Sequence, residues 1–286
     1  MNSELLRPIS VEEVEIYHRD GVVPLRNMFD KDWIELLNKG LDVNIENPTK
    51  RSRIWHKDNS GHSMFYDHTA WQNINEYKKF VFNSPAAQIC GQLTKSTTIN
   101  FFFDSVFVRS TGTQFETPWH QDEPYWSVEG YDACTIWIPL VPVKKKSSLS
   151  FVPGSHLWKT IFKHYNFGDL NPVGKKNVDQ VDFSNVAEKE LPDINADPER
   201  FGVTSWDMQP GDCIVFNGRT MHGGSGKLED DCELRVFTTK WAGDDIRIKF
   251  RNYGMDPDHS VEMIEKGLKT GDCLGTDLYP QIWPKS

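Results

Sequence analysis

The stretch CTIWIPLVPV, residues 134–143, is a short β-type run of mostly apolar side chains, and it belongs to a series. The similar runs are TTINFFFDSVFVRS (97–110), SLSFVPGS (148–155), DCIVFNG (212–218) and LRVFTTKWAG (234–243). Glycine, proline, asparagine and aspartate bound most of them, at the spacing expected of a sandwich or barrel of short strands. We therefore expect a mainly β core over about residues 96–245.

The part before this core, about residues 1–95, is predicted to be mainly helical. Ser10 and Glu13 have the spacing of a capping box before the helical stretch VEEVEIYHRD, and Asp30 is a candidate N-cap for KDWIELLNKGL. Between these two helices, GVVPLRNMF (21–29) has the composition of a short strand.

Residues 159–200 interrupt the series of strands with charged residues, proline and asparagine. They predict a long insertion between strands, and long ordered loops are often lids or binding loops. Residues 246–286 form a C-terminal extension of mixed composition. The sequence has no internal repeat, low-complexity tract or linker, so we expect residues 1–286 to form a single domain.

Bulk properties exclude several classes of protein. The formal net charge is −9 over 286 residues, which argues against nucleic acid and anionic membranes as partners. No apolar run approaches the roughly 20 residues of a spanning helix, and the first residues lack the pattern of a signal peptide. The five cysteines include no CxxC pair and indicate reduced thiols, so we expect a cytoplasmic protein. The oligomeric state stays open.

Histidine and aspartate lie two positions apart at three places: His18/Asp20, His56/Asp58 and His120/Asp122. The first pair ends a predicted helix, where such side chains point to different faces. The second lies in a polar loop, where solvated side chains are the simpler interpretation. The third lies in TPWHQDEPYW (117–126) at the start of a β segment, where residues two apart share a face. Two such ligands and a third from elsewhere form the facial triad that holds Fe(II) with open positions.

The third ligand is expected on a later strand, and His222 in GDCIVFNGRTMHGGSG is the candidate. Arg235 follows on the next predicted strand, and a guanidinium pairs with a carboxylate through two parallel hydrogen bonds. Taken singly, His222 is explained as a turn or core histidine and Arg235 as a surface ion pair. Together with His120 and Asp122, they favour a metal site that also binds a small dicarboxylate.

The ordered motifs resemble the phytanoyl-CoA dioxygenase family of Fe(II)- and 2-oxoglutarate-dependent oxygenases. The matching segments lie between about residues 95 and 245: PWHQDEPYW, CTIWIPLVPV, SLSFVPGSH, MQPGDCIVFNGRTMHGGSG and LRVFTTKW. The resemblance implies a double-stranded β-helix, which is a cupin-like jelly roll with flanking helices. Two features depart from the family pattern: the turn before PGSH, and an interval from His222 to Arg235 that is longer than in some members.

By position, the resemblance implies three iron ligands, which are also the catalytic residues: His120, Asp122 and His222. It implies four residues around 2-oxoglutarate: Arg235 at the far carboxylate, Trp137 along the co-substrate, Arg109 where the family usually has lysine, and Ser225 at a carboxylate. The longer interval after His222 puts the role of Ser225 in doubt.

The implied activity is that of an oxidoreductase that uses Fe(II), 2-oxoglutarate and O₂ to hydroxylate a small-molecule metabolite, with release of succinate and CO₂. Asp122 favours hydroxylation, because related halogenases lack that carboxylate; desaturation and ring closure stay open. Two other functions remain: a cupin-type metalloenzyme that does not use 2-oxoglutarate, and a non-catalytic sensor that binds metal or 2-oxoglutarate.

The substrate is the least determined part of the hypothesis. Three aromatic residues near the metal motif are candidate substrate contacts, with the core as their alternative location: Tyr125, Trp126 and Trp119. Aromatic faces beside acids suit a cationic group, which favours a small amine or quaternary ammonium compound. A phosphonate or an acyl-CoA stays possible.

Overall fold

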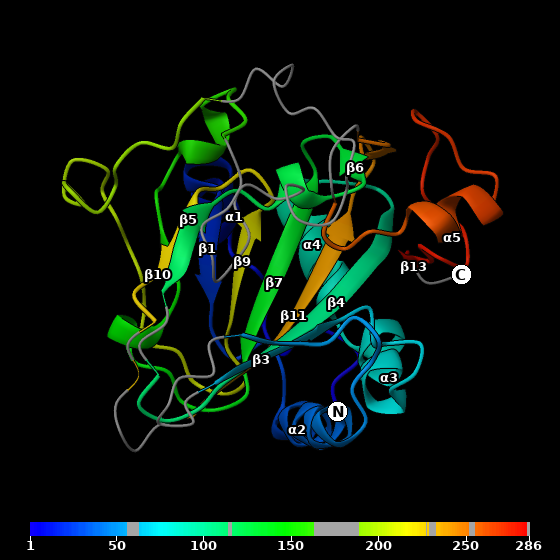
Figure 1. The fold of residues 1–286 in the computed structure, drawn as a ribbon, viewed down its shortest axis with the longest axis horizontal. Helices are drawn as coiled ribbons and strands as arrows, with labels where there is room; N and C mark the ends of the chain where they lie inside the picture. Colours follow the sequence, from blue (N-terminus) through cyan, green and yellow to red (C-terminus); the bar gives the residue numbers. More distant parts are fainter. Residues whose placement is uncertain are drawn as a thin grey trace.

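The computed structural model describes residues 1–55, 63–113, 116–162, 189–226, 228, 233–251 and 255–284. Its main element is an eight-stranded antiparallel sheet (Figure 1). Seven of the strands follow the order β1-β9-β7-β11-β4-β3-β2, and the eighth, β13, pairs with β4. The strands of this sheet are β1 (Val22–Leu25), β2 (Arg53–Trp55), β3 (Met64–His68), β4 (Ile99–Arg109), β7 (Ala133–Pro139), β9 (Cys213–Asn217), β11 (Leu234–Ala242) and β13 (Gln281–Trp283).

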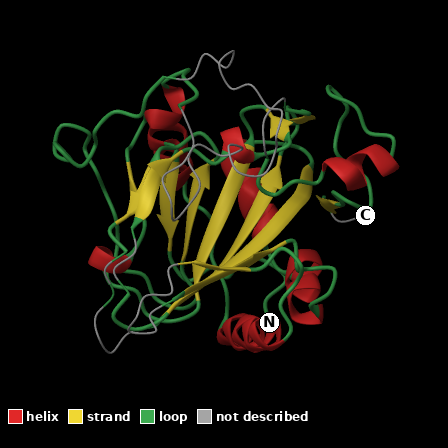
Figure 2. Cartoon of the chain, viewed as in Figure 1, coloured by secondary structure: helices red, strands yellow, loops and turns green. Residues whose placement is uncertain are grey.

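Two smaller sheets complete the β structure. One has the order β5-β10-β8 and the other pairs β12 with β6. Their strands are β5 (Thr117–His120), β6 (Val128–Glu129), β8 (Ser150–Phe151), β10 (His222–Gly224) and β12 (Arg247–Ile248). The helices are α1 (Val11–Asp20), α2 (Lys31–Glu46), α3 (Asn75–Asn83), α4 (Ala86–Thr94) and α5 (Ser260–Glu265). The fold is the expected mainly β jelly roll with flanking helices (Figure 2).

Alternate residues of the central strands enter two different cores, because successive side chains of a strand point to opposite faces. In β11, Phe237 packs against Tyr77 and Phe80 of α3, with ring centroids 4.7 and 5.5 Å apart. Its neighbour Val236 belongs instead to the cluster between the main sheet and the β5-β10-β8 sheet. The main sheet therefore has one face against helices and one face against the smaller sheet.

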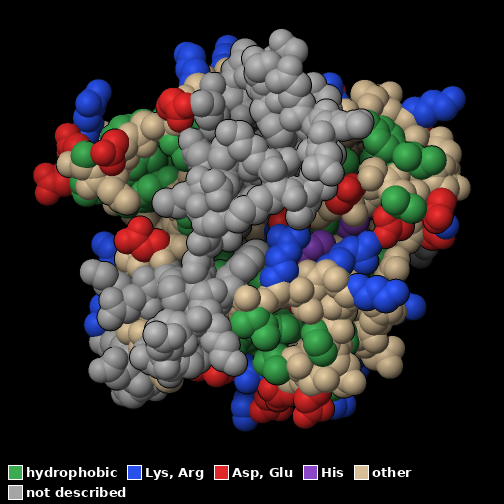
Figure 3. All heavy atoms as spheres, in the orientation of Figure 1, with side chains coloured by type: hydrophobic (Ala, Val, Ile, Leu, Met, Phe, Trp, Pro, Cys, Tyr) green, Lys and Arg blue, Asp and Glu red, His purple; other side chains and the backbone are tan. Residues whose placement is uncertain are grey.

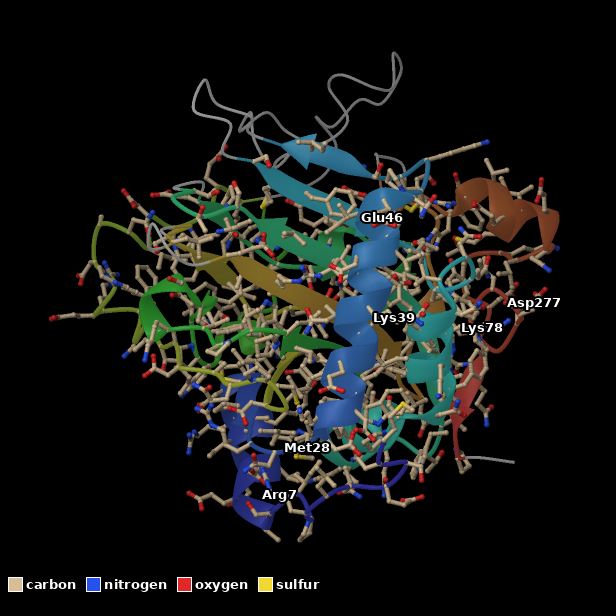
Figure 4. All side chains as sticks on the ribbon, turned by 90° about the horizontal axis from the view of Figure 1, so that it is seen from below. Arg7, Met28, Lys39, Glu46, Lys78 and Asp277 are labelled. Atoms are coloured by element: carbon tan, nitrogen blue, oxygen red, sulfur yellow. The ribbon has the colours of Figure 1, made fainter. Side chains whose placement is uncertain are left out.

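On the helix-covered face, α2 lies beside α3 (Figure 4). An ion pair of 3.0 Å joins Lys39 of α2 to Glu76 of α3. This placement brings α2 over β11, the strand that carries Arg235. Among the described residues, the structure has no helix with the length and apolar character needed to span a bilayer.

Most of the local predictions are confirmed. The capping box of Ser10 and Glu13 is present in α1, and the Asp30 side chain accepts a hydrogen bond from Trp33 at the start of α2. The prediction missed the antiparallel β2–β3 pair, which joins the main sheet through β4, because residues 51–65 were interpreted as a polar loop. Much of the predicted insertion, residues 163–188, lies outside the described residues, as do His56 and Asp58.

Candidate metal centre

Two histidines from different strands meet in the smaller sheet. β5 and β10 pair antiparallel with His120 opposite His222, and the two ring centroids are 4.1 Å apart. Both side chains are buried. The close approach depends on Gly223, because a Cβ at this position would lie only 3.0 Å from the Thr117 carbonyl oxygen. The pairing of these strands therefore positions both imidazoles.

Asp122 follows β5 directly and completes the cluster. Its backbone N–H donates to the Gly218 carbonyl at 2.9 Å, and the Thr135 hydroxyl donates to Oδ2 at 2.9 Å. The other carboxylate oxygen, Oδ1, lies 3.5 Å from His120 Nε2 and 3.7 Å from His222 Nε2. Thr135 thus orients the carboxylate so that one oxygen faces both imidazoles.

The tautomers of both histidines follow from their partners. Nδ1 of His120 lies 2.8 Å from the Pro118 carbonyl oxygen, and Nδ1 of His222 lies 2.9 Å from the Thr220 carbonyl oxygen. Because a carbonyl oxygen only accepts, each Nδ1 carries the hydrogen, and the lone pair of each Nε2 faces Asp122. This arrangement, with one ring nitrogen held by the backbone, is typical of metal-ligating histidines.

The electrostatics favour the proton-free forms of His222 and Asp122. Burial lowers the pKa of His222 to about 3. Although burial alone would raise the pKa of Asp122, the neighbouring His222 and His120 hold it well below its ordinary value. The three donor atoms lie within 4.8 Å of one another, and no other group of three metal-ligating side chains occurs among the described residues. Two imidazoles and a carboxylate suit Fe(II) with open coordination positions.

The role of Thr135 can be tested directly. Thr135→Val removes the hydrogen bond to Asp122 Oδ2 while keeping the shape of the side chain, and we expect Fe(II) affinity to fall about 10- to 100-fold. Thr239→Val on β11 is the matched control, because its hydroxyl contacts Trp241 on the opposite face of the sheet. Equal Fe(II) affinity of wild type and Thr135→Val in a titration would show that the carboxylate is oriented by other contacts.

A cavity of about 730 Å³, counted with its open mouth, adjoins this cluster. Trp137 and Arg109, two of the residues predicted to lie around 2-oxoglutarate, line it. The Arg109 side chain is buried and donates to the Thr117 hydroxyl and to Met64 Sδ, and burial lowers its pKa to about 10. No ion pair joins it to a carboxylate in the described part of the chain.

Arg235 does not reach this cavity, so its predicted position in the site is wrong. Its guanidinium pairs with Asp42 of α2 at 2.5 Å and donates to the Asn38 carbonyl at 3.3 Å. The neighbours Leu234 and Val236 line the cavity instead. Because residues alternate between the faces of β11, a shift of one position moves a side chain from the site to the helix layer.

Two further predicted residues lie away from the metal centre. Ser225 is exposed and donates to the Lys146 carbonyl at 2.9 Å, because the chain has turned outward after β10. Trp119 precedes His120 in β5 and therefore points to the other face, where its indole N–H donates to Asn195 at 2.8 Å. Both line a separate cavity that includes neither His120 nor His222.

The remaining predicted residues, Tyr125 and Trp126, line a second and smaller cavity that also includes His120 and Asp122. The sequence analysis missed Lys240, a buried lysine of β11 that lines both this cavity and the larger one. The alternation through Leu234, Val236 and Thr238 leads to Lys240, so the correct register of β11 would have identified it.

Comparison with known proteins agrees with this geometry. A family model described as "Phytanoyl-CoA dioxygenase (PhyH)" matches residues 17–230. The comparison with curated proteins gave no match.

Among solved structures, similar chains include the non-heme alpha ketoglutarate dependent carbocyclase SnoK from nogalamycin biosynthesis, with a TM-score of 0.71, 17% identity, and coverage of 99% of this chain and 100% of that chain. The epimerase SnoN in complex with Fe3+, alpha ketoglutarate and nogalamycin RO gives a TM-score of 0.64 at 19% identity, covering 95% and 97%. EctD from S. alaskensis with 2-oxoglutarate and 5-hydroxyectoine gives 0.66 at 16% identity, covering 94% and 86%. At these identities the structural likeness establishes the fold.

Proposed function

Because the chain belongs to the phytanoyl-CoA dioxygenase family of Fe(II)- and 2-oxoglutarate-dependent oxygenases, we propose that it hydroxylates a small-molecule metabolite. The observation that carries the proposal is the cluster of His120, Asp122 and His222, whose donor atoms converge beside a cavity. A metalloenzyme that does not use 2-oxoglutarate does not fit this family. The assignment of individual residues is part of the proposal.

The metal would be held by Nε2 of His120, Oδ1 of Asp122 and Nε2 of His222. When bound, Fe(II) with 2-oxoglutarate and O₂ supplies the oxidising power that breaks a substrate C–H bond, while 2-oxoglutarate becomes succinate and CO₂. The chain contributes orientation: Thr135 holds the carboxylate, and two backbone carbonyls hold the imidazoles. These contacts orient the three donor atoms toward one another beside the cavity.

The larger cavity would take 2-oxoglutarate, and Arg109 would pair with its far carboxylate. A buried guanidinium without a carboxylate partner is costly unless a ligand supplies the charge, and a dicarboxylate supplies it. Trp137, Leu234 and Val236 form apolar walls along the same cavity and exclude water around the co-substrate.

Hydroxylation is proposed over halogenation because Asp122 would be a third protein ligand at the position where related halogenases lack a carboxylate. The fold alone does not decide the outcome, since SnoK is described as a carbocyclase and SnoN as an epimerase.

The test is to measure succinate release from 2-oxoglutarate with and without Fe(II), and then to identify the product formed under ¹⁸O₂. We expect iron-dependent succinate release and a product that gains one labelled oxygen atom from a small acid, amine or phosphonate substrate. Iron-dependent release with a product that has lost two hydrogens would replace hydroxylation by desaturation or ring closure. Absence of iron-dependent release with every substrate offered would point to a binding protein without turnover.

A further inference from the structure

The second cavity adjoins the metal cluster without sharing the proposed co-substrate clamp. It measures about 450 Å³ with its opening. His120, Asp122, Phe107 and Lys240 line both cavities, whereas Arg109 lines only the larger one. A molecule in the second cavity would therefore reach the metal ligands while 2-oxoglutarate occupies the first.

Aromatic side chains form one part of the wall of the second cavity, and the ionisable His120, Asp122, Lys240 and Asp256 form another. Five rings contribute to the aromatic part: Tyr66, Phe103, Phe107, Tyr125 and Trp126. The Tyr66 and Phe107 rings pack with centroids 4.9 Å apart, and Tyr125 lies edge-on to the His120 ring at 5.9 Å. Such a wall favours a ligand with an apolar or aromatic body.

Lys240 places a cation in this aromatic cavity. Its side chain is buried, and Nζ donates to the hydroxyls of Ser105 and Thr238 at 2.5 Å each. The ammonium also lies 4.7 Å from the centroid of the Phe103 ring. Burial lowers the pKa of Lys240 to about 8, so it is mostly protonated at neutral pH. Both hydroxyl partners are neutral, and no ion pair joins Lys240 to a carboxylate among the described residues.

The acidic groups nearest to Lys240 already have other partners. Asp122 belongs to the metal cluster. Asp104 accepts hydrogen bonds from two backbone N–H groups at 3.1 Å each, and burial raises its pKa to about 6. Asp256 pairs with Arg53 at 2.6 Å. Once a metal ion neutralises Asp122, the charge of Lys240 is left for a ligand to balance.

Figure 3 shows Lys and Arg atoms next to the few histidine atoms that reach the surface on this face, with Asp and Glu atoms also close by.

From these contacts we infer that the second cavity binds the substrate, and that the substrate is an organic anion whose carboxylate or phosphate pairs with Lys240 while an apolar body lies against the aromatic wall. The inference rests on the proposed function, because it assigns the larger cavity to 2-oxoglutarate. An anionic substrate takes the place of the small amine that the sequence suggested, because a cationic group would face the ammonium of Lys240 in a buried space.

The test is isothermal titration of the Fe(II)-loaded protein with 2-oxoglutarate present and oxygen excluded. Four probes share a phenyl body and differ in the polar group: 3-phenylpropionate, phenyl phosphate, 3-phenylpropanol and 3-phenylpropylamine. We expect at least one anion to bind at least about tenfold more tightly than both the alcohol and the amine. The better anion also distinguishes a carboxylate substrate from a phosphate.

Variants then assign the preference to one side chain. Lys240→Met should remove the advantage of the anion and leave 2-oxoglutarate affinity unchanged, whereas Lys240→Arg should retain most of it. If Lys240→Met does not fold, Lys240→Gln serves in its place. Lys249→Met is the control, because this lysine pairs with Glu129 at 3.1 Å and lines neither cavity.

Three results would overturn the inference. The wild-type protein could bind neither anion more tightly than the amine and the alcohol. The preference for the anion could survive loss of the Lys240 charge, or Lys240→Met could lose 2-oxoglutarate binding. The last result would assign Lys240 to the co-substrate. A wild type that does not bind 2-oxoglutarate with Fe(II) refutes the proposed function instead, and the probe titrations without 2-oxoglutarate still decide the role of Lys240.

Discussion

Replacing His222 by alanine is expected to abolish iron-dependent release of succinate from 2-oxoglutarate, and replacing His120 or Asp122 is expected to have the same effect. Each substitution removes one of the three converging donors and so weakens binding of the ion. Loss of contacts to ligating residues already costs about 10- to 100-fold in metal affinity or activity. Loss of a ligand itself should therefore cost at least about 100-fold in Fe(II) affinity.

The matched control is His18→Ala. His18 belongs to a rival His-x-Asp pair, and it is exposed at the end of α1, outside the metal cluster. This variant should keep wild-type iron binding and succinate release. Thermal unfolding without metal should be followed for each variant, so that loss of the fold is separated from loss of the ion. Wild-type, iron-dependent turnover in any of the three cluster variants would contradict the assignment.

The second large effect concerns the co-substrate. Arg109→Met should raise the KM for 2-oxoglutarate at least about tenfold, because a hydrogen bond to a charged group contributes about 1.5–3 kcal/mol. Methionine keeps much of the apolar volume, so the change mainly removes the charge. Isothermal titration of 2-oxoglutarate into the Fe(II)-loaded protein should show the same loss of affinity.

Arg235→Met is the control for this experiment, because its guanidinium contacts Asp42 and the Asn38 carbonyl on the helix-covered face. It should change stability slightly and leave the KM for 2-oxoglutarate as in wild type. The opposite pattern, with a raised KM in Arg235→Met and an unchanged KM in Arg109→Met, would mean that β11 presents its other face to the cavity.

The metal cluster was predictable because its signal is partly local. His120 and Asp122 share a face of an extended segment, and the sequence shows this spacing directly. His222 is distant in sequence, and no spacing rule selects it. Its place after a later predicted strand made it a candidate, and the resemblance to a family implied its role as a ligand. The antiparallel pairing of β5 with β10 gives the physical reason why it lies beside His120.

Arg235 was misplaced because β11 is buried on both faces. A strand with one solvated face alternates between polar and apolar residues, and that alternation fixes which residues face the core. In LRVFTTKWA, buried residues occupy nearly every position, so the sequence does not indicate which set faces the cavity. The same ambiguity hid Lys240. Arg109, at the end of β4, was identified, but only as a secondary contact.

The β2–β3 pair was missed for a different reason. β2 has three residues and lies at the edge of the main sheet, and its sequence is too short to show a strand pattern. Its pairing with β3 is a tertiary contact, which local sequence does not specify. The core strands β4, β7, β9 and β11 are longer and more apolar, and they were recognised.

The central claim is that three side chains, distant in sequence, bind one ferrous ion. The most direct measurement is a crystal structure of the protein loaded with Fe(II) without oxygen, with anomalous scattering recorded at the iron edge. We predict a single anomalous peak within coordination distance of His120 Nε2, His222 Nε2 and a carboxylate oxygen of Asp122. An iron-loaded crystal with no peak at this position, or with its peak at other histidines such as His68 and His259, would contradict the account.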